Sequence, residues 1–466
     1  MTLPPNWQEK PLSEVVTFNP RHDRGLPDDL DVSFVPMPKI SERSRYLSQH
    51  DSRKLGDVKR GYTHFRDGDV LFAKITPCME NGKAAIASSL TNGLGCGTTE
   101  LHVLRPSDSV LPEWLYYYVW QERIRKEAER NMTGSAGQLR VPLSFLEEQA
   151  IPVPDSIDEQ RQITNKLDHI AAHLGDTRVR LETIPSILKR FRMSVLAAAC
   201  SGRLTEDWRK QHPECSQEGL AALELKRISV EKRKWALENL AMHSEAKRLL
   251  KRLAEVPPQL ETDESLPSSW IKATMSELCH LVVDCHNKTA PYAESGIPLV
   301  RTTNVKDGQL ILDGIKYVTD ETYSFWSRRC PPESGDIIFT REAPIGDACI
   351  VPDGHTVCLG QRTMLFRTWH GLSSNTYLLY AILSPIFRTQ YEDYAVGGGV
   401  VHLRVGDVEG LRVPVPPYNE QLEIVRRVQA MFELATTIEA RYRKAKTFTD
   451  KLMPAVLAKA FRGELL

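Results

Sequence analysis

The residues that could carry metal or phosphate chemistry are few, and their spacing fits no known site. Cys279-His280 and Cys285-His286 are the densest group of possible metal ligands, but their separation matches no zinc template, which favours packed thiols beside polar histidines. A phosphate-binding loop needs Gly-x-x-x-x-Gly-Lys-Ser/Thr, and Gly82-Lys83-Ala84 lacks both the upstream glycine and the hydroxyl residue. We therefore expect no metal ion and no nucleotide on this chain.

The sequence also lacks the motifs of a catalyst. Val415-Pro416-Pro417-Tyr418 is similar to the Asp/Asn-Pro-Pro-Tyr loop of amino-methyltransferases, but valine replaces the polar residue that holds the target amino group. Gly397-Gly398-Gly399 has no strand-plus-helix context and is interpreted as a flexible loop. Neither Gly-x-Ser-x-Gly nor His-Glu-x-x-His occurs. We expect a chain without catalytic residues that binds no cofactor itself.

Contact with DNA is predicted only locally. Residues 39–66 hold eight basic residues, against Glu42, Asp51 and Asp57, with Tyr46 and Tyr62 between them; the basic residues are Lys39, Arg43, Arg45, Arg53, Lys54, Lys59, Arg60 and Arg66. Such a patch can neutralise phosphates, or it can be an ordinary polar surface. The chain as a whole has 60 Lys+Arg and 60 Asp+Glu, so bulk charge does not favour DNA binding.

Two flexible turns add further candidates for DNA contact. The turn from Gly134 to Gln138 precedes Arg140, and the turn at 397–399 is followed by His402 and Arg404. An arginine placed there could reach guanine N7/O6 or a phosphate, and it could equally be a strand-end charge. The predicted DNA-binding residues are Lys39, Arg43, Arg45, Lys74, Ser135, Gln138, Arg140, Arg301, Thr303, Asn304, Arg341, Arg362, His402 and Arg404.

The elements that position these residues occur twice along the chain. Gly68 to Lys74 returns as Gly335 to Arg341, and Ile151-Pro152-Val153-Pro154 returns as Val413-Pro414-Val415-Pro416. Leu139-Arg140-Val141 matches Leu403-Arg404-Val405 in the same order. The pattern predicts a duplicated unit of about 200 residues rather than a short repeat.

Each repeat is predicted to begin with an α+β globule, at 1–154 and 266–416. Short β-branched or aromatic runs predict strands at 69–75, 101–104, 337–340 and 363–367, and helical stretches are expected at 112–130 and 375–391. Proline-rich segments close both globules.

A long heptad helix follows each globule. Apolar residues recur in steps of four and three from Ile163 to Val195 and from Ile424 to Val456. Such a narrow seam indicates pairing with another helix, the alternative being core helices of an ordinary bundle. About 40 residues would make a rod on the order of 60 Å long. Pro185 and Pro454 predict a kink or break in it.

An insert at 205–265 has no counterpart in the second repeat. Residues 216–255 are expected to form one charged helix, either a solvated face or a docking helix for a partner. The predicted partner-binding residues are Leu188, Phe191, Trp208, Trp235 and Phe461.

These motifs resemble those of the specificity subunit of type I restriction–modification systems, most closely the enterobacterial type IA subclass. The resemblance is carried by Ile187 to Arg192, Gly202 to Arg209, Glu420 to Val428 and Leu457 to Leu465. The family often continues beyond the Gly-Glu-Leu sequence that ends here at Leu465-Leu466.

The resemblance implies an α+β architecture with pseudo-two-fold symmetry, in which two long helices pair as an antiparallel coiled coil. It implies target-recognition domains at 1–154 and 266–416, a central helical region with the insert at 155–265, and a C-terminal helix at 417–466. Each domain would read one half of an asymmetric, interrupted DNA site. Partners would be double-stranded DNA, two methyltransferase subunits and restriction/translocase subunits. S-adenosylmethionine, ATP and Mg²⁺ would be bound by those partners.

Two other classes of function stay open at this point. A fused modification enzyme would require cofactor motifs, which are not found. A coiled-coil scaffold without DNA specificity would keep the helices and use the globules to bind proteins. The nine cysteines, an odd number without a Cys-x-x-Cys pair, are typical of reduced thiols in the cytoplasm. No apolar run approaches 18 residues, so no membrane association is expected.

Overall fold

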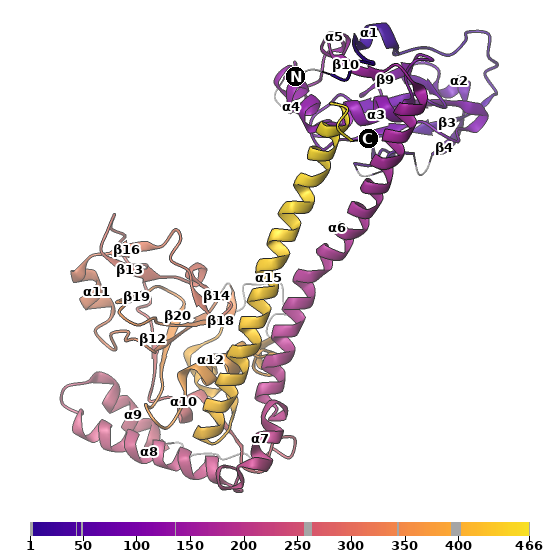
Figure 1. The fold of residues 1–466 in the computed structure, drawn as a ribbon. Helices are drawn as coiled ribbons and strands as arrows, with labels where there is room; N and C mark the ends of the chain where they lie inside the picture. The colour runs from indigo at the N-terminus through magenta and orange to yellow at the C-terminus, as the bar shows by residue number, and fades with distance from the viewer. Residues whose placement is uncertain are drawn as a thin grey trace. The chain divides into compact units, whose positions relative to one another are not determined.

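The chain divides into two compact units. The computed structural model describes residues 3–42, 44–47, 50–135, 137–255, 263–342, 344–392 and 402–465. The first unit comprises residues 1–184 and 441–466, and the second comprises 185–440. Each unit contains one α+β globule and one part of each of two long helices, α6 (Ile157–Cys200) and α15 (Tyr418–Ala460) (Figure 1).

Two four-stranded sheets form the first globule. The antiparallel sheet has the order β2-β9-β6-β7, with β2 (Val16–Phe18), β9 (Leu101–Pro106), β6 (Val70–Ala73) and β7 (Ala84–Ile86). The other has the order β4-β3-β8-β5 and a parallel β3–β8 pair, with β4 (Asp51–Lys54), β3 (Asp31–Val35), β8 (Leu94–Gly97) and β5 (Thr63–Arg66). The strands predicted at 69–75 and 101–104 are β6 and β9, so both predictions are confirmed.

The second globule repeats this plan. Its antiparallel sheet has the order β12-β20-β17-β18, with β12 (Leu281–Asp284), β20 (Thr363–Arg367), β17 (Ile337–Arg341) and β18 (Ile345–Ile350). A three-stranded sheet again contains a parallel pair, in the order β16 (Lys316–Val318), β13 (Ile297–Val300), β19 (Cys358–Leu359). A short hairpin joins β14 (Val305–Lys306) to β15 (Gln309–Leu310). The shared strand order confirms the predicted duplication and the strands at 337–340 and 363–367.

An antiparallel strand pair closes each globule. β1 (Trp7–Pro11) pairs with β10 (Ala150–Pro154), and β11 (Ile271–Thr274) pairs with β21 (Arg412–Val415). The same type of bond ties a helix to each pair: Trp114 Nε1 donates to the Pro152 carbonyl at 2.9 Å, and the Tyr377 hydroxyl donates to the Pro414 carbonyl at 2.7 Å. The proline-rich segments are therefore strand edges whose free carbonyls accept helix side chains.

The helices of each globule are broken where a single stretch was predicted. α3 (Pro112–Trp120) and α4 (Glu122–Arg130) are separated by Gln121, and α12 (Asn375–Leu383) and α13 (Pro385–Glu392) are separated by Ser384. Ser384 precedes a proline, which disfavours helical backbone at that residue. The predictions of one helix at 112–130 and one at 375–391 are therefore wrong in continuity. Short helices complete the globules: α1 (Leu12–Val15), α2 (Leu55–Val58), α5 (Leu143–Glu147), α10 (Met275–Leu278), α11 (Asp320–Trp326) and α14 (Val405–Gly410).

The two long helices run antiparallel. In the first unit Lys166 Nζ donates to the Leu465 carbonyl at 3.3 Å, and Arg178 pairs with Asp450 at 3.7 Å, so residue numbers rise along α6 as they fall along α15. In the second unit Arg192 pairs with Glu439 at 3.1 Å. The coiled-coil prediction is confirmed.

Neither proline breaks its helix. α6 continues through Pro185 and α15 through Pro454, so neither helix breaks there, and the alternative of a kink stays a prediction. A proline in a helix interior costs about 3 kcal/mol because it removes one amide donor. Burial of Leu188 in the seam and of Met453 next to it offsets that cost.

The insert forms separate helices rather than one. α7 (Glu206–Gln211) is followed by α8 (Leu220–Glu238) and α9 (Ser244–Glu255), which lie side by side (Figure 1). Asn239 ends α8, since its side-chain amide and its backbone amide both donate to the Trp235 carbonyl, at 2.9 and 3.0 Å. The prediction of one helix over 216–255 is therefore wrong.

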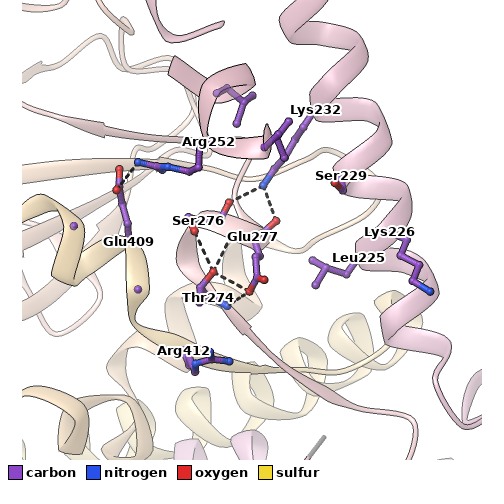
Figure 2. A pocket seen from close by; sticks show the side chains of 14 residues that line it. Leu225, Lys226, Ser229, Lys232, Arg252, Thr274, Ser276, Glu277, Glu409 and Arg412 are labelled. Atoms are coloured by element: carbon purple, nitrogen blue, oxygen red, sulfur yellow. Dashed lines mark hydrogen bonds and ion pairs between the residues drawn. The ribbon is translucent and has the colours of Figure 1, made fainter. Parts of the chain in front are cut away.

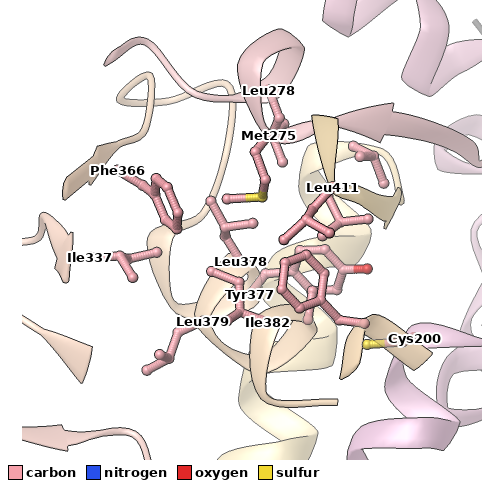
Figure 3. Packing of buried hydrophobic residues seen from close by; sticks show 14 of the residues in the cluster. Cys200, Met275, Leu278, Ile337, Phe366, Tyr377, Leu378, Leu379, Ile382 and Leu411 are labelled. Atoms are coloured by element: carbon pink, nitrogen blue, oxygen red, sulfur yellow. The ribbon is translucent and has the colours of Figure 1, made fainter. Parts of the chain in front are cut away.

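The core of each unit combines globule and long-helix residues. In the second unit Cys200 of α6 joins a cluster with Met275, Tyr377 and Leu411 (Figure 3). In the first unit Phe461 packs on Trp114, with ring centroids 4.4 Å apart. None of the described helices combines the length and the apolar character that a membrane span requires.

Candidate nucleic-acid interface

A polar groove of about 480 Å³ opens on the first globule. It is lined by residues of the β2–β3 and β8–β9 connections and of the segment around β5, together with Lys74 after β6. The polar lining residues include four cations and no carboxylate: Asn19, Arg21, Lys59, Arg60, Tyr62, Thr63, His64, Lys74 and Thr99. A groove of this composition favours an anionic ligand such as a phosphate backbone.

Two stacked histidines shape the groove wall. The rings of His22 and His64 lie 4.7 Å apart. The His22 backbone amide donates to His64 Nδ1 at 3.2 Å, and His64 Nε2 lies 3.0 Å from the Lys59 carbonyl. These contacts assign the proton of neutral His64 to Nε2. Burial lowers the pKa of His22, which keeps that ring neutral at pH 7.

An ion pair holds Arg140 beside Lys74. Arg140 Nε and Nη2 each donate to one Glu100 carboxylate oxygen at 2.8 Å, and the Arg140 side chain is 40% exposed. The Arg140 hydrogen bonds lower the pKa of Glu100, and burial lowers the pKa of Lys74. Backbone bonds in both directions between Thr133 and Arg140, each 2.9 Å, fix the base of the turn that contains Ser135 and Gln138. The predicted turn thus presents a partly exposed arginine whose fork is held in one orientation.

The second globule builds the same edge with different side chains. The Val141 amide donates to the Lys74 carbonyl at 2.9 Å, as the Leu403 amide does to the Arg341 carbonyl at 3.2 Å. An isolated bridge joins Ile75 to Arg140, and another joins Glu342 to His402. By these bonds Arg140 is equivalent to His402. The predicted match of Arg140 to Arg404 is therefore wrong by two residues.

Three positions in each unit are equivalent, and we call them the clamp positions. They are Ile75, Glu100 and Arg140 in the first unit, and Glu342, Arg362 and His402, in the same order, in the second. Glu100 and Arg362 are equivalent because their carbonyls accept from the amides of Lys74 and Arg341, at 3.0 and 2.9 Å. In the second unit the carboxylate lies elsewhere in the trio: Glu342 is 3.0 Å from Arg362 Nε and 3.3 Å from His402 Nδ1. Arg362 has φ +72°, a backbone conformation that costs a non-glycine residue energy and is concentrated at functional sites.

The other predicted DNA-binding residues divide into surface and interior. Thr303 and Arg404 are exposed and Arg301 is half-buried. Asn304 is buried, with its amide oxygen accepting from the Arg301 backbone at 3.2 Å and its amide nitrogen donating to the Ile311 carbonyl at 3.0 Å. Arg341 is also buried, paired with Asp284 at 3.0 Å. Asn304 and Arg341 therefore stabilise the globule and present little surface to DNA.

Much of the predicted basic patch is already paired. Lys39 lies 3.8 Å from Asp51, Lys54 pairs with Asp31 and Lys59 with Asp28. Arg45 pairs with Asp168 of α6 and donates to the Tyr46 hydroxyl at 2.7 Å, so it fixes this segment to the long helix. Arg43 lies outside the described residues.

The residues predicted to bind partners are buried or half-buried within their own units. Leu188 and Phe461 are buried, and Phe191 packs against the core of the second unit. Trp235 contacts the rings of His243 and His280, and Trp208 stacks on His212 at 4.6 Å. Leu188 and Phe191, the two of these residues that belong to the heptad pattern, are therefore packed at least in part within the chain itself.

The Cys-His pairs show packing contacts. Cys279 and Cys285 are buried, His280 packs against Trp235 and Trp369, and His286 stacks on Trp326. Within the described ranges no three His, Cys, Asp or Glu side chains are grouped to hold a metal ion. All nine cysteines are free thiols.

Several residues of this candidate interface were not predicted from the sequence. Asn19, Arg21, His64 and Thr99 line the groove, Glu100 holds Arg140, and Glu342 holds Arg362. Arg21-His22-Asp23-Arg24 was a visible polar cluster between two strands. Nothing in the sequence marked Glu100 or Glu342, because their roles depend on strand register.

The fold and the groove define a class: a duplicated α+β recognition protein whose globules are joined by antiparallel helices. The sequence profile of the type I restriction modification DNA specificity domain matches residues 4–180 and 267–446. The chain belongs to this family.

Individual relatives support the assignment. The chain is 28% identical to the type I restriction enzyme EcoAI specificity subunit of Escherichia coli, over 95% of this chain and 80% of the relative. It is 26% identical to the StySPI specificity subunit of Salmonella potsdam, over 99% and 90%. Its fold is similar to the HsdS subunit of Thermoanaerobacter tengcongensis, with a TM-score of 0.60 and 18% identity over 100% of this chain and 99% of that structure.

Proposed function

We propose that this chain gives a type I restriction–modification complex its DNA sequence specificity. Each globule reads one half of an asymmetric, interrupted site, and the antiparallel helices set the spacing between the halves. The chain itself is non-catalytic and acts in the cytoplasm. Family membership and the similarity to named specificity subunits support this assignment.

The observation that carries the proposal is the difference between the clamp positions of the two units. Both units hold partly exposed basic side chains with a carboxylate at the clamp positions, but the arrangement differs: Glu100 holds Arg140 in the first unit, and Glu342 contacts Arg362 and His402 in the second. Base pairs differ in the pattern of hydrogen-bond donors and acceptors on their edges. Two different half-sites therefore require different polar side chains on the same backbone framework. In the first unit the cationic groove beside Arg140 would follow the phosphates.

The remaining chemistry belongs to partners. Two methyltransferase subunits would use S-adenosylmethionine to methylate adenine N6 after flipping the base. Restriction subunits would use ATP and Mg²⁺ for translocation and cleavage. A near-neutral recognition subunit suits such an assembly, since partners that close around the DNA would supply both charge and catalysis.

Methylome sequencing tests the proposal. A methylation-free host carrying the partner methyltransferase gene is compared with and without this chain. N6-methyladenine should appear only with the chain, and in one interrupted asymmetric motif. A soluble complex that leaves the genome unmethylated would overturn the proposal.

Salt dependence separates DNA recognition from the scaffold alternative. Phosphate contacts release counterions, so the DNA affinity of the complex should fall about 10³-fold or more between 50 and 200 mM salt if six or more phosphates are contacted. A scaffold without DNA specificity would show no such affinity at either salt concentration.

A further inference from the structure

We propose that the outer face of α8 is a docking surface for an acidic amphipathic helix of a partner subunit. The inference rests on the proposed function, because it assigns the occupant to the same multisubunit complex. It concerns the part of the chain that has no counterpart in the other repeat.

The inner face of α8 is firmly attached to the second globule. Ala221, Leu225, Ile228, Lys232 and Ala236 are buried. Lys232 Nζ donates to the Ser276 carbonyl at 2.9 Å and to the Glu277 carbonyl at 2.6 Å, and Figure 2 shows its side chain reaching from α8 to these two groups. The Glu224 carboxylate accepts from the Tyr418 backbone amide at 2.8 Å. A helix held in this way offers its other face without the cost of ordering it.

The outer face of α8 bears an exposed apolar stripe. Leu223, Val230 and Leu237 are 59%, 65% and 59% exposed and recur at seven-residue spacing. Two turns of helix separate each pair, so the three side chains lie on one face, opposite Leu225, Ile228 and Lys232. Leu240 and Met242, 47% and 91% exposed, follow directly after the helix. We name Leu223, Val230 and Leu237 the α8 stripe.

Basic residues flank the α8 stripe on both sides. At 3.6 residues per turn, Arg227 and Lys234 border one side, and Lys226 and Arg233 border the other. All four are exposed, and the described residues place no carboxylate in an ion pair with them. Residues 220–255 contain nine Lys and Arg against five Glu, in a chain whose total charge is balanced.

Charge and spacing together specify the occupant. Apolar residues at heptad spacing pack into a partner helix with apolar residues at the same spacing, and flanking charges select the partner's flanking charges. The matching helix has Leu-type residues in its seam and Glu or Asp on either side. A nucleic-acid backbone would match the cations but would leave the α8 stripe against phosphates, so the apolar residues favour a protein helix.

Two double variants test the surface in the full chain. Val230→Glu with Leu237→Glu removes the apolar contact, and Arg227→Glu with Lys234→Glu reverses the charge. Lys247→Glu on α9 is the matched control, since it changes an exposed basic residue of the insert away from the stripe. The probes are a designed helix three heptads long with a Leu seam and Glu flanks, the same helix with Lys flanks, and the purified methyltransferase and restriction subunits.

The acidic helix should bind the wild-type chain and the Lys247→Glu control, and both double variants should bind it at least about 10-fold more weakly. One of the two partner subunits should lose affinity in parallel, while affinity for a short DNA duplex is unchanged. Equal binding of the acidic and basic helices would overturn the proposal, as would unchanged subunit binding. A loss confined to DNA would assign the face to nucleic acid instead. If the wild-type complex methylates no motif, the proposed function itself fails, whatever the α8 variants do.

Discussion

At the scale of single residues, two equivalent carboxylates are held in different ways. Glu420 is fully buried and accepts from Trp270 Nε1 at 2.8 Å, from the Thr205 hydroxyl at 2.7 Å and from Arg209 at 2.6 Å. Its equivalent in the first unit, Glu159, is half-buried and accepts from the neutral groups of Trp7 and Asn6, at 3.0 and 2.9 Å. One glutamate therefore neutralises a charge and the other does not.

Glu420→Ala should lower the free energy of unfolding by about 3–5 kcal/mol, because it leaves the largely buried Arg209 charge unpaired. Glu159→Ala should cost only about 1–3 kcal/mol, because its donors are neutral. Urea unfolding of the full chain, followed by tryptophan fluorescence, measures both. Equal losses would show that the Arg209 pair contributes nothing specific.

Arg140 is predicted to read a base. Arg140→Ala should weaken binding of the specific DNA site by roughly 10–100-fold, and it should relax one position of one half-site, the usual effect of losing a bidentate base contact. Glu100→Gln should give a smaller loss of affinity and specificity, because the Arg140 guanidinium is then no longer held in one orientation. Quantitative footprinting on single-base site variants measures both effects. Lys126→Ala on α4, an exposed residue paired with Glu122, is the control. Uniform weakening across all site variants would make Arg140 a phosphate contact.

The geometry of the candidate interface was predicted only in part, for a definite reason. The turn before Arg140 and the exposed positions Arg362 and His402 followed from residue type. Their equivalence did not, because Leu-Arg-Val occurs in both repeats two residues out of structural register. Backbone pairing sets the register of the two repeats. The two-residue error in aligning them can be detected only from the backbone hydrogen bonds of Lys74 and Arg341.

At the scale of elements, glycine is required just after each long helix but not inside it. Gly202 has φ +77°, and a Cβ there would lie 2.4 Å from Pro267 Cγ; Gly463 has φ +74°, with Pro4 Cγ at 2.2 Å. Both positions therefore require glycine. Gly175 lies inside α6, is exposed, and would have no atom within 4 Å of an added Cβ.

Gly175→Ala should stabilise the chain by about 0.5–1 kcal/mol, because alanine loses less backbone entropy in a helix. Gly202→Ala should destabilise it by more than that amount, through clash and strain. Thermal unfolding of both variants measures the contrast. A destabilising Gly175→Ala would contradict the regular helix described there.

The contact between α8 and the second globule should depend on pH. Burial, reinforced by the Lys232 and Arg367 cations, lowers the pKa of His280 to about 3. The unfolded chain takes up this proton near pH 6.5 and the folded chain does not, so stability is full above pH 6.5. It should fall by about 1 kcal/mol for each pH unit below 6.5, until the ring itself is protonated. His280→Phe should flatten this slope in urea titrations from pH 7 to 5; an unchanged slope would remove His280 as the cause.

The type of each secondary-structure element was easier to predict than the residues at which it begins and ends. Heptad spacing predicted α6 and α15, and short β-branched or aromatic runs predicted β6, β9, β17 and β20. The breaks at Gln121 and after Asn239 were missed because helix propensity continues across them, and backbone capping decides where a helix ends. Pro185 and Pro454 do not break their helices, since seam packing outweighs one lost hydrogen bond.

At the scale of the whole molecule, duplication is the main organising feature. Both units contain a bidentate arginine–aspartate pair at the same place: Arg105 with Asp69, and Arg367 with Asp336, at 2.7–2.9 Å. The two globules thus share this backbone framework, while the side chains at their clamp positions differ. If one frame reads one half-site, exchanging one globule should change one half of the recognised sequence and leave the other intact.

The most direct test is therefore an exchange of residues 1–154 for the corresponding segment of a relative with a different site. Methylomes are sequenced from a methylation-free host with the partner methyltransferase, for the parent and for the hybrid chain. We expect one interrupted motif from each chain; the two motifs should share one half and the spacer length and differ in the other half. A hybrid whose motif is unchanged, or altered in both halves, would contradict the division of recognition between two globules.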